Sequence, residues 1–281
     1  MSAGRGQGRE SAAAQPEPLP AGAFDSHCHL DMIDRPVSEI VAEASAVGIT
    51  RMITIGCDLR SSRWAARCAA DNSGIYAAVA IHPNETTAAA AEPGGSAAVL
   101  AEIAALAALP RVRAVGETGL DYYRDSSEPA VQRDWFRAHI EIAKATGKAL
   151  MIHDRDAHED VLRLLAADGA PERVVFHCFS GDRAMAARCA EAGYVMSFAG
   201  NVTFASAQQL RDAAEVAPAE LILVETDAPF LTPVPYRGKP NTPAMVAHTV
   251  RRIAEVKRLG LEELCAAIAV TGERVFGPWQ D

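Results

Sequence analysis

Closely spaced cysteines are missing from this chain of 281 residues. Its six cysteines lie far apart and include no C-x-x-C pair, and a chain of this size does not need disulfides to stabilise a small core. We therefore predict reduced thiols at all six positions, which are Cys28, Cys57, Cys68, Cys178, Cys189 and Cys265.

The chain also has no long apolar run and no excess of positive charge. Its longest apolar stretch, residues 97–109, is interrupted by Glu102 and is shorter than the roughly 20 residues that cross a bilayer. We predict no transmembrane helix and no membrane partner. The net charge of −9, from 27 basic and 36 acidic residues, argues against a protein that coats nucleic acid through its overall field. A phosphate-binding site would have to create its positive charge locally.

Residues 1–22 differ in composition from the rest of the chain. They mix Gly, Pro, Ala and charges of both signs, without the apolar core of a secretory signal. We expect residues 1–22 to form a disordered tail, residues 23–281 to form one folded domain, and the protein to be cytoplasmic. No sequence feature fixes an oligomeric state, and a monomer is favoured.

From Phe24 onward, short β-branched runs alternate with stretches of helical periodicity, a pattern typical of βα units around a parallel sheet. Several helical stretches end at a glycine, as at Gly147 and Gly193. Eight strands are the number that closes a TIM barrel. We therefore predict a single-domain α/β fold, a TIM (β/α)8 barrel. The expected strands are residues 24–27, 50–56, 76–81, 112–116, 149–153, 174–177, 194–198 and 221–225.

The end of the first expected strand carries two histidines two residues apart. Because side chains alternate along a strand, Asp25, His27 and His29 share one face and Cys28 lies on the other. Two imidazoles then converge on one point, which is a good start for a metal site.

Other expected strands end in the same kind of residue. Five of the eight histidines, together with Glu117 and Asp227, fall where strands end, the face on which barrel enzymes place their chemistry. These five are His27, His29, His82, His153 and His177, whereas His139, His158 and His248 fall in helical stretches, where a solvated or packing role is expected.

Four imidazoles and two carboxylates suit two divalent ions that share a carboxylate and a hydroxide. Two dications contribute +4, while Glu117, Asp227 and the hydroxide subtract 3, which leaves a formal charge of about +1. That local charge could hold a phosphate in an acidic protein.

Seven segments stand in this order along the chain: DSHCHLD, GETGLDYY, HDRDA, HCFSGD, SFAGNVTF, ETDAPFL and PVPYRGKPNTPAMV. They resemble the signatures of the TatD family of metal-dependent deoxyribonucleases, within the amidohydrolase superfamily, in the family's order. The resemblance covers about residues 23 to 276 and implies a TIM barrel, a divalent-metal centre and phosphodiester hydrolysis, typically 3′-to-5′ exonuclease action on DNA.

The resemblance also implies a role for each strand-end residue. His27 and His29 match ligands of a first metal, Glu117 the carboxylate shared between metals, and His153 and His177 ligands of a second metal. Asp227 matches the aspartate that binds metal and takes a proton from the attacking water. Two positions depart from the family pattern: Asp154 stands where threonine is usual, and Thr271 where asparagine commonly stands.

Further residues are candidates for supporting roles. Asp25 and Glu225 each precede a ligand by two residues, so each is expected one layer deeper, orienting a metal-bound histidine or pairing with a basic residue. His82 is a candidate either to bind a substrate phosphate or to cap its loop. Asn201, Arg237 and Lys239 are candidates for substrate binding, although such loop residues are usually solvated or brace a turn. Tyr122, Tyr123 and Phe204 would either stack on bases or pack.

The leading hypothesis is a two-metal phosphodiesterase that acts on DNA, with RNA as another possible substrate and Asp227 as general base. The same barrel and ligands also support a hydrolase of a small ester, amide or lactone, and a non-catalytic binding protein is a third reading. Imidazole ligands favour Zn²⁺, Mn²⁺ or Fe²⁺, whereas activity in the family is associated with Mg²⁺.

Overall fold

The computed structural model describes residues 14–124 and 126–279. Eight strands form one sheet in which each strand pairs in parallel with the next, in the order of the chain. All eight predicted strands are present, and the TIM barrel is confirmed. The strands are β1 (Ala23–Cys28), β2 (Ile49–Ile55), β3 (Ile75–Val79), β4 (Val112–Asp121), β5 (Ala149–Arg155), β6 (Val174–Phe176), β7 (Val195–Phe198) and β8 (Ile222–Val224).

Residues after β8 meet β1 and nearly close the ring. Cys28 and Ala228 form an isolated parallel bridge, and the backbone N–H of His29 donates to the Ala228 carbonyl at 2.8 Å. The backbone N–H of Asp227 donates to the His27 carbonyl at 2.9 Å. The seam of the barrel therefore lies at residues that the sequence marks as functional.

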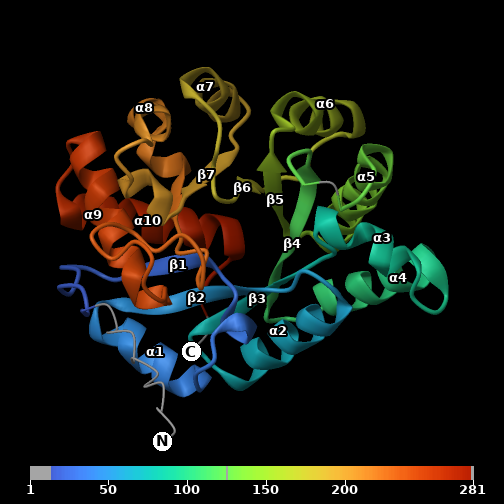
Figure 1. Ribbon diagram of the computed structural model, residues 1–281, viewed down its shortest axis with the longest axis horizontal. Helices are drawn as coiled ribbons and strands as arrows, with labels where there is room; N and C mark the ends of the chain where they lie inside the picture. Colours follow the sequence, from blue (N-terminus) through green and yellow to red (C-terminus); the bar gives the residue numbers. More distant parts are fainter. Residues whose placement is uncertain (1–13, 125, 280–281) are drawn as a thin grey trace, which may run out of the picture.

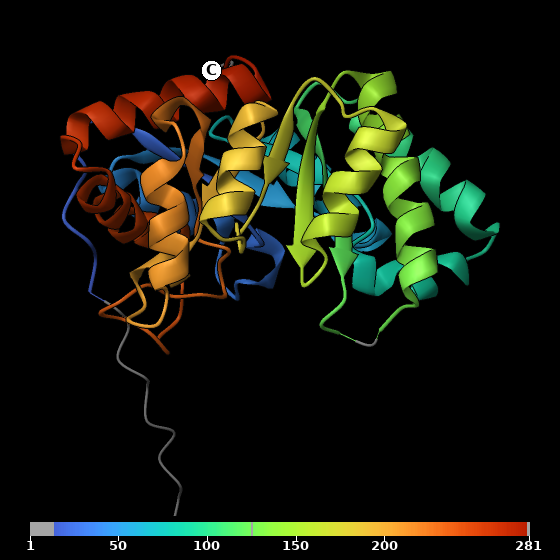
Figure 2. The same cartoon turned by 90° about the horizontal axis from the view of Figure 1, so that it is seen from above.

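Helices surround the strands (Figure 1). The arrowheads of β4 and β5 point toward the side of the barrel that carries the long loops, and α10 covers the opposite side (Figure 2). The α-helices are α1 (Val37–Ala46), α2 (Leu59–Asp71), α3 (Thr86–Ala90), α4 (Gly95–Ala107), α5 (Pro129–Thr146), α6 (His158–Asp168), α7 (Arg183–Glu191), α8 (Gln208–Val216), α9 (Val246–Lys257) and α10 (Leu261–Phe276). The 3-10 helices are η1 (Leu30–Met32), η2 (Pro83–Glu85), η3 (Gly200–Thr203), η4 (Ala219–Leu221) and η5 (Pro243–Met245).

Local sequence explains where these elements lie. β3 is buried along its whole length, because helices cover the outside of the barrel and side chains fill its inside. Helix α5 begins at Pro129, whose fixed φ suits a first helical position, and ends before Gly147, whose left-handed φ of 64° favours glycine. Among the described residues, none of the helices has the length and apolarity that a membrane crossing requires.

Strand β4 extends five residues beyond its predicted end at residue 116. After a register shift between Val115 and Thr118, pairing with β5 resumes and continues to Asp121 opposite Arg155. At Gly119, a Cβ would lie 2.0 Å from the His153 carbonyl oxygen, so only glycine allows the strands to approach this closely. The extension places Glu117 and Asp121 on one strand.

The folded part of the chain begins before the predicted boundary at residue 23. Leu19 is buried, and its backbone N–H donates to the Val47 carbonyl at 3.0 Å. The Arg251 guanidinium donates to the carbonyls of Glu17 and Pro18 at 2.8 and 3.1 Å. Residues 14–22 of the predicted tail therefore run against the barrel, and the tail's residues 1–13 lie outside the described part of the chain.

Candidate metal centre

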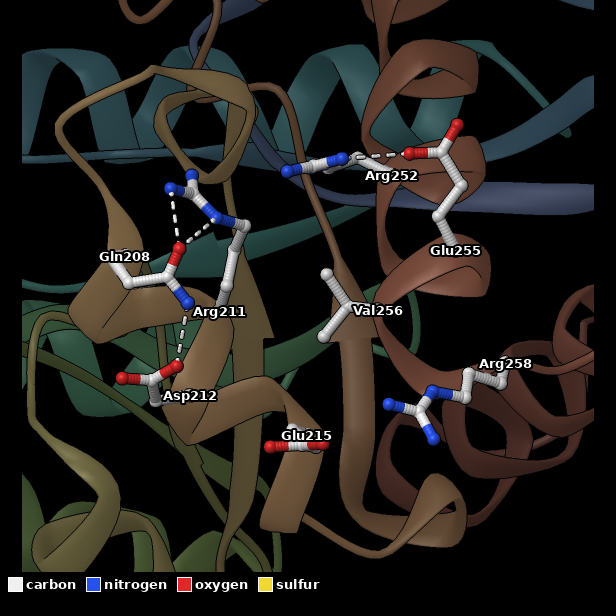
Figure 3. A pocket seen from close by; sticks show the side chains of 8 residues that line it. All are labelled: Gln208, Arg211, Asp212, Glu215, Arg252, Glu255, Val256 and Arg258. Carbon is white, nitrogen blue, oxygen red and sulfur yellow. Dashed lines mark hydrogen bonds and ion pairs between the residues drawn. The ribbon is translucent and has the colours of Figure 1, made fainter.

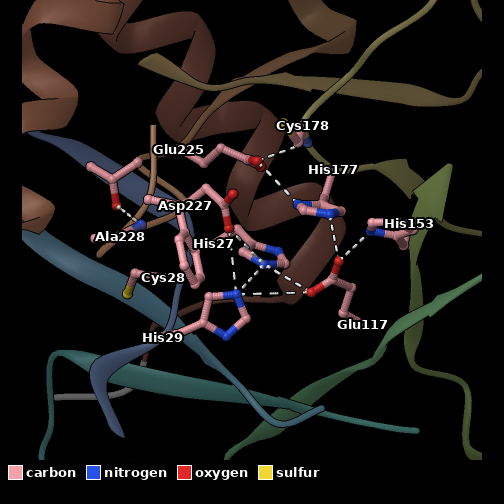
Figure 4. Close-up of polar contacts among 12 residues, drawn as sticks. His27, Cys28, His29, Glu117, His153, His177, Cys178, Glu225, Asp227 and Ala228 are labelled. Atoms are coloured by element: carbon pink, nitrogen blue, oxygen red, sulfur yellow. Dashed lines mark hydrogen bonds and ion pairs between the residues drawn. The ribbon is translucent and has the colours of Figure 1, made fainter. Parts of the chain in front are cut away.

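Glu117 lies between two pairs of imidazoles (Figure 4). Its Oε2 is 3.5 Å from His27 Nε2 and 3.8 Å from His29 Nε2. Its Oε1 is 2.6 Å from His153 Nδ1 and 2.8 Å from His177 Nε2. The two oxygens of one carboxylate thus face two separate groups of nitrogen donors.

Asp227 completes the group on the β1 side. Its Oδ1 is 3.4 Å from His29 Nε2 and 3.7 Å from His27 Nε2. The backbone of Asp227 has a φ of 53°, which is uncommon for a residue with a side chain, and it is held by hydrogen bonds to His27 and Phe230. All six residues predicted as ligands therefore lie in one cluster at the carboxyl ends of the strands.

The electrostatics of the cluster fit divalent cations. Burial acts to raise the pKa of Glu117, but the charge of His177 and hydrogen bonds from His153 and His177 hold it well below its usual range. Burial acts to lower the pKa of His177, yet Glu117 and Glu225 raise it well above the usual value. Protons on imidazoles here balance buried carboxylates, and divalent cations would replace those protons. Imidazole and carboxylate donors together suit Zn²⁺, Mn²⁺ or a similar ion.

Glu225 lies behind His177, as predicted. The fully buried Glu225 accepts the backbone N–H of Cys178 at 2.7 Å, and its Oε1 is 3.2 Å from His177 Nδ1. Its other oxygen, Oε2, is buried and has no hydrogen-bond partner among the described residues. Glu225 forms with His27 and His177 one of the groups that could hold an ion.

Asp25 is also fully buried, but its contacts differ from those predicted. Its carboxylate accepts hydrogen bonds from the backbone N–H and hydroxyl of Thr226 and from the backbone N–H of His27, and burial raises its pKa to about 8. Among the described residues it has no hydrogen bond to a histidine ring. Asp25 therefore ties β1 to the segment after β8 and supports His27 through the backbone.

His82 both caps its loop and faces the cluster. Its Nδ1 accepts the backbone N–H of Asn84 at 3.1 Å, at the start of η2. Its Nε2 lies 3.3 Å from His153 Nδ1 and 3.4 Å from Glu117 Oε1. Burial lowers the pKa of this ring, and in a neutral ring whose Nδ1 accepts, Nε2 carries the proton. His82 therefore offers the cluster an N–H donor and not a lone pair.

Asp121 is a member of the site that the sequence reasoning missed. Its Oδ2 is 3.2 Å from His153 Nε2, on the side of the ring away from Glu117. Two sulfur atoms, also missed, lie behind the other rings: Met151 Sδ is 3.1 Å from His27 Nδ1, and Cys57 Sγ is 3.8 Å from His29 Nδ1.

The predicted substrate-binding residues of the loops lie apart from the cluster. Asn201 Nδ2 is 3.9 Å from Cys178 Sγ, and the guanidinium carbon of Arg237 is 4.4 Å from the centre of the Phe204 ring. Lys239 is exposed, and its backbone bonds within its own loop. In the described part of the chain, no hydrogen bond or ion pair joins these three side chains to the cluster.

Two exposed aromatic rings flank the site. Phe230 is 51% exposed, with its ring centre 6.0 Å from that of His29. Tyr123 is 64% exposed and is covered on one face by Arg155, whose guanidinium carbon lies 3.9 Å from the ring centre.

Histidines in the helices have other environments. His139 is fully buried in α5, which agrees with a packing role. His158 Nδ1 is 2.8 Å from Asp154 Oδ2, so the carboxylate that departs from the family pattern faces α6. Thr271, the other departure, is buried and donates its hydroxyl to the Glu220 carbonyl at 3.0 Å.

A separate pocket of about 300 Å³ lies between α8 and α9 (Figure 3). Several of its polar groups bond to one another: Arg211 donates to Gln208, Gln208 to Asp212, and Arg252 to Glu255. Because its basic and acidic side chains offset each other, this pocket is a weaker candidate than the strand-end cluster.

Comparisons with known proteins cover almost the whole barrel. The sequence model of a family described as TatD related DNase matches residues 24–277. The chain is 44% identical over 262 residues to an uncharacterized metal-dependent hydrolase TatD of Mycobacterium tuberculosis, with 90% of this chain and 97% of that protein covered. It is 36% identical over 257 residues to the uncharacterized metal-dependent hydrolase YabD of Bacillus subtilis, with 90% and 98% covered.

A solved structure is similar to the same extent. The crystal structure of YJJV, a TatD homologue from Escherichia coli K12, matches with a TM-score of 0.83 at 26% sequence identity. The match covers 91% of this chain and 98% of that one.

Proposed function

Since this chain belongs to the TatD related DNase family of metal-dependent hydrolases, we propose that it hydrolyses phosphodiester bonds of DNA at a centre of two divalent cations, as a 3′-to-5′ exodeoxyribonuclease. The observation that carries the proposal is the position of Glu117, whose two oxygens face different pairs of imidazoles. His27, His29 and Asp227 would hold one cation with Glu117. His153 and His177 would hold the other with the same carboxylate.

Cations held by these residues would lower the pKa of a bound water and stabilise charge on the phosphate oxygens. The chain's own groups then divide the remaining work. Asp227, whose pKa burial acts to raise but whose histidine neighbours hold it low, is ionised at neutral pH and accepts the proton of the attacking water. His82 donates its Nε2–H toward the second cation's side of the cluster, where a phosphate oxygen would accept it.

Charge at the centre bears on how a phosphate is held. The sequence tally of about +1 counted two carboxylates, but Asp121 and Glu225 also lie within hydrogen-bond distance of imidazoles. With these two included, two dications are neutralised before any hydroxide is counted. A neutral centre would not attract a phosphate through a net positive field. It would bind the phosphate by direct ligation to the cations and by local donors such as His82.

Aromatic and basic residues at the rim of the site support a DNA strand as the substrate. Phe230 beside His29 and Tyr123 beneath Arg155 offer exposed ring faces, on which bases of a single strand can stack with little sequence preference. Arg237 and Lys239 would contact phosphates farther along the strand, and Asn201 would contact the substrate near Cys178.

The test is hydrolysis of end-labelled single-stranded DNA by the metal-loaded protein. We expect shortening from the 3′ end that requires a divalent cation and is lost in Asp227→Asn, whereas the matched variant Asp212→Asn, on α8, retains it. RNA and small esters or lactones are assayed in parallel. Equal DNA hydrolysis by wild type and Asp227→Asn, or turnover of esters alone, would refute the nuclease assignment. Failure of calorimetry to detect any bound cation would favour a non-catalytic protein.

A further inference from the structure

The histidines of the centre do not all present the same nitrogen to Glu117. His27, His29 and His177 present Nε2, whereas His153 presents Nδ1, 2.6 Å from Glu117 Oε1. A neutral imidazole carries one proton, and only its other nitrogen has a lone pair for a cation. His153 can therefore serve a cation through Nδ1 only while its proton stays on Nε2.

Asp121 occupies the position that keeps the proton there. Its Oδ2 lies 3.2 Å from His153 Nε2 and also accepts from Asn84 Nδ2 at 3.0 Å. Its Oδ1 accepts the backbone N–H groups of Tyr123 and Arg124 at 3.0 and 2.9 Å. The carboxylate is 1% exposed, and three donors besides the imidazole fix its orientation.

We infer that Asp121 is a positioning residue that selects Nδ1 of His153 as the nitrogen for the second cation. The inference rests on the two-cation centre proposed above. Carboxylates behind metal-bound histidines fix the tautomer and raise the basicity of the ligating nitrogen.

Among the described residues, carboxylate support of this kind is found in one half of the centre. His153 is backed by Asp121 and His177 by Glu225. The second nitrogens of His27 and His29 face sulfur atoms of Met151 and Cys57, which are weak acceptors. The first cation would have Asp227 as an additional direct ligand. The second cation would have one ligand fewer, and the buried carboxylates behind His153 and His177 compensate for it.

Asp121→Asn gives a sharp test. The asparagine oxygen would keep the backbone donors of Tyr123 and Arg124, so its NH₂ group would face His153 Nε2 and shift the ring proton to Nδ1. We expect calorimetric titration of the metal-free protein with Mn²⁺ to show one of two binding events weakened by about 10- to 100-fold. His177→Ala, which removes a ligand of the second cation, should abolish that same event. Met151→Leu is the matched control, because it changes the atom behind His27, and it should leave that event unchanged.

A second measurement reads the tautomer directly in the loaded protein, where a cation would take the place of the proton between His153 Nδ1 and Glu117. Long-range ¹H–¹⁵N correlation spectra of the Zn²⁺-loaded protein should show His153 protonated on Nε2. The resonance is assigned by its loss in His153→Gln. In Asp121→Asn, at the same Zn²⁺ concentration, this Nε2–H resonance should be lost. The wild-type spectrum tests the inference even if the variant does not fold.

Each outcome has a defined meaning. A wild-type His153 protonated on Nδ1, or Mn²⁺ binding that is unaffected in Asp121→Asn, would overturn the inference and leave the proposed nuclease function standing. Absence of DNA hydrolysis would refute the proposed function without touching either readout.

Discussion

Protonation of His139 should destabilise the barrel and disturb the strand end that carries His82. His139 is fully buried on α5, where its Nε2 accepts the backbone N–H of Ile81 at 3.1 Å and its Nδ1 donates to the Trp135 carbonyl at 2.7 Å. A proton added to Nε2 would point at the N–H of Ile81, so two donors would face each other and the hydrogen bond would be lost. Burial accordingly lowers the pKa of this ring to about 4.

The size of the effect follows from that pKa. An unfolded chain has a histidine pKa of about 6.5, and each unit of difference corresponds to about 1.4 kcal/mol, so the shift is equivalent to about 3 kcal/mol. The folded state favours the neutral ring. This stabilisation is therefore complete above about pH 6.5 and is lost as the pH falls toward about 4, below which both states bind the proton.

The assay is urea unfolding of wild type and His139→Gln across this pH range, with a chelator present so that bound cations do not contribute. Glutamine places a neutral acceptor in reach of the Ile81 N–H, so the variant lacks the titration while other groups stay common to both proteins. Between pH 7 and pH 4, the free energy of unfolding should fall by about 3 kcal/mol more in the wild type than in the variant. Parallel pH profiles would refute the reasoning.

Three further predictions concern the site and its support. Phe230→Ala should raise KM for single-stranded DNA about fivefold or more with little change in kcat, since stacking on one base contributes about 1–3 kcal/mol; an unchanged KM in steady-state assays would contradict base stacking there. Gly200→Ala should lower the free energy of unfolding by about 1–3 kcal/mol, because the new Cβ would lie 2.2 Å from the Leu231 carbonyl oxygen. In the control Gly22→Ala, the new Cβ would lie 3.8 Å from its nearest neighbour, so thermal melts should show no loss of stability. Chelation should lower Tm, and Mn²⁺ at about 100 times its Kd should restore about 2.7 kcal/mol per independent site, with a smaller gain in His177→Ala; identical melts with and without chelator would count against a bound cation.

The alternation of short apolar runs with helical stretches predicts the barrel well, because most of its strands are short and buried. The runs at residues 76–81 and 149–153 correspond to β3 and β5 within two residues at each end. The N-terminal boundary was harder to predict. A Pro- and Ala-rich composition favours disorder, but Leu19 finds a backbone partner in Val47, and such a distant contact leaves no periodic signal.

The site shows what alternation can and cannot predict. Period two places Glu117, Gly119 and Asp121 on one face, so Asp121 was within reach of the same reasoning that found the ligands, had the strand been extended past Gly116. The glycines at 116 and 119 are not typical of a continuing strand, because glycine in a sequence favours a turn. Here they allow the close approach of β5. Asp25 shows the opposite limit. Alternation gives the face of a strand but not the partner across the seam, and the partner of Asp25 is Thr226, from a segment 201 residues away. A carboxylate two residues before a ligand can therefore either support an imidazole, as Glu225 does, or close the barrel, and only the register of β1 against the end of β8 decides between them.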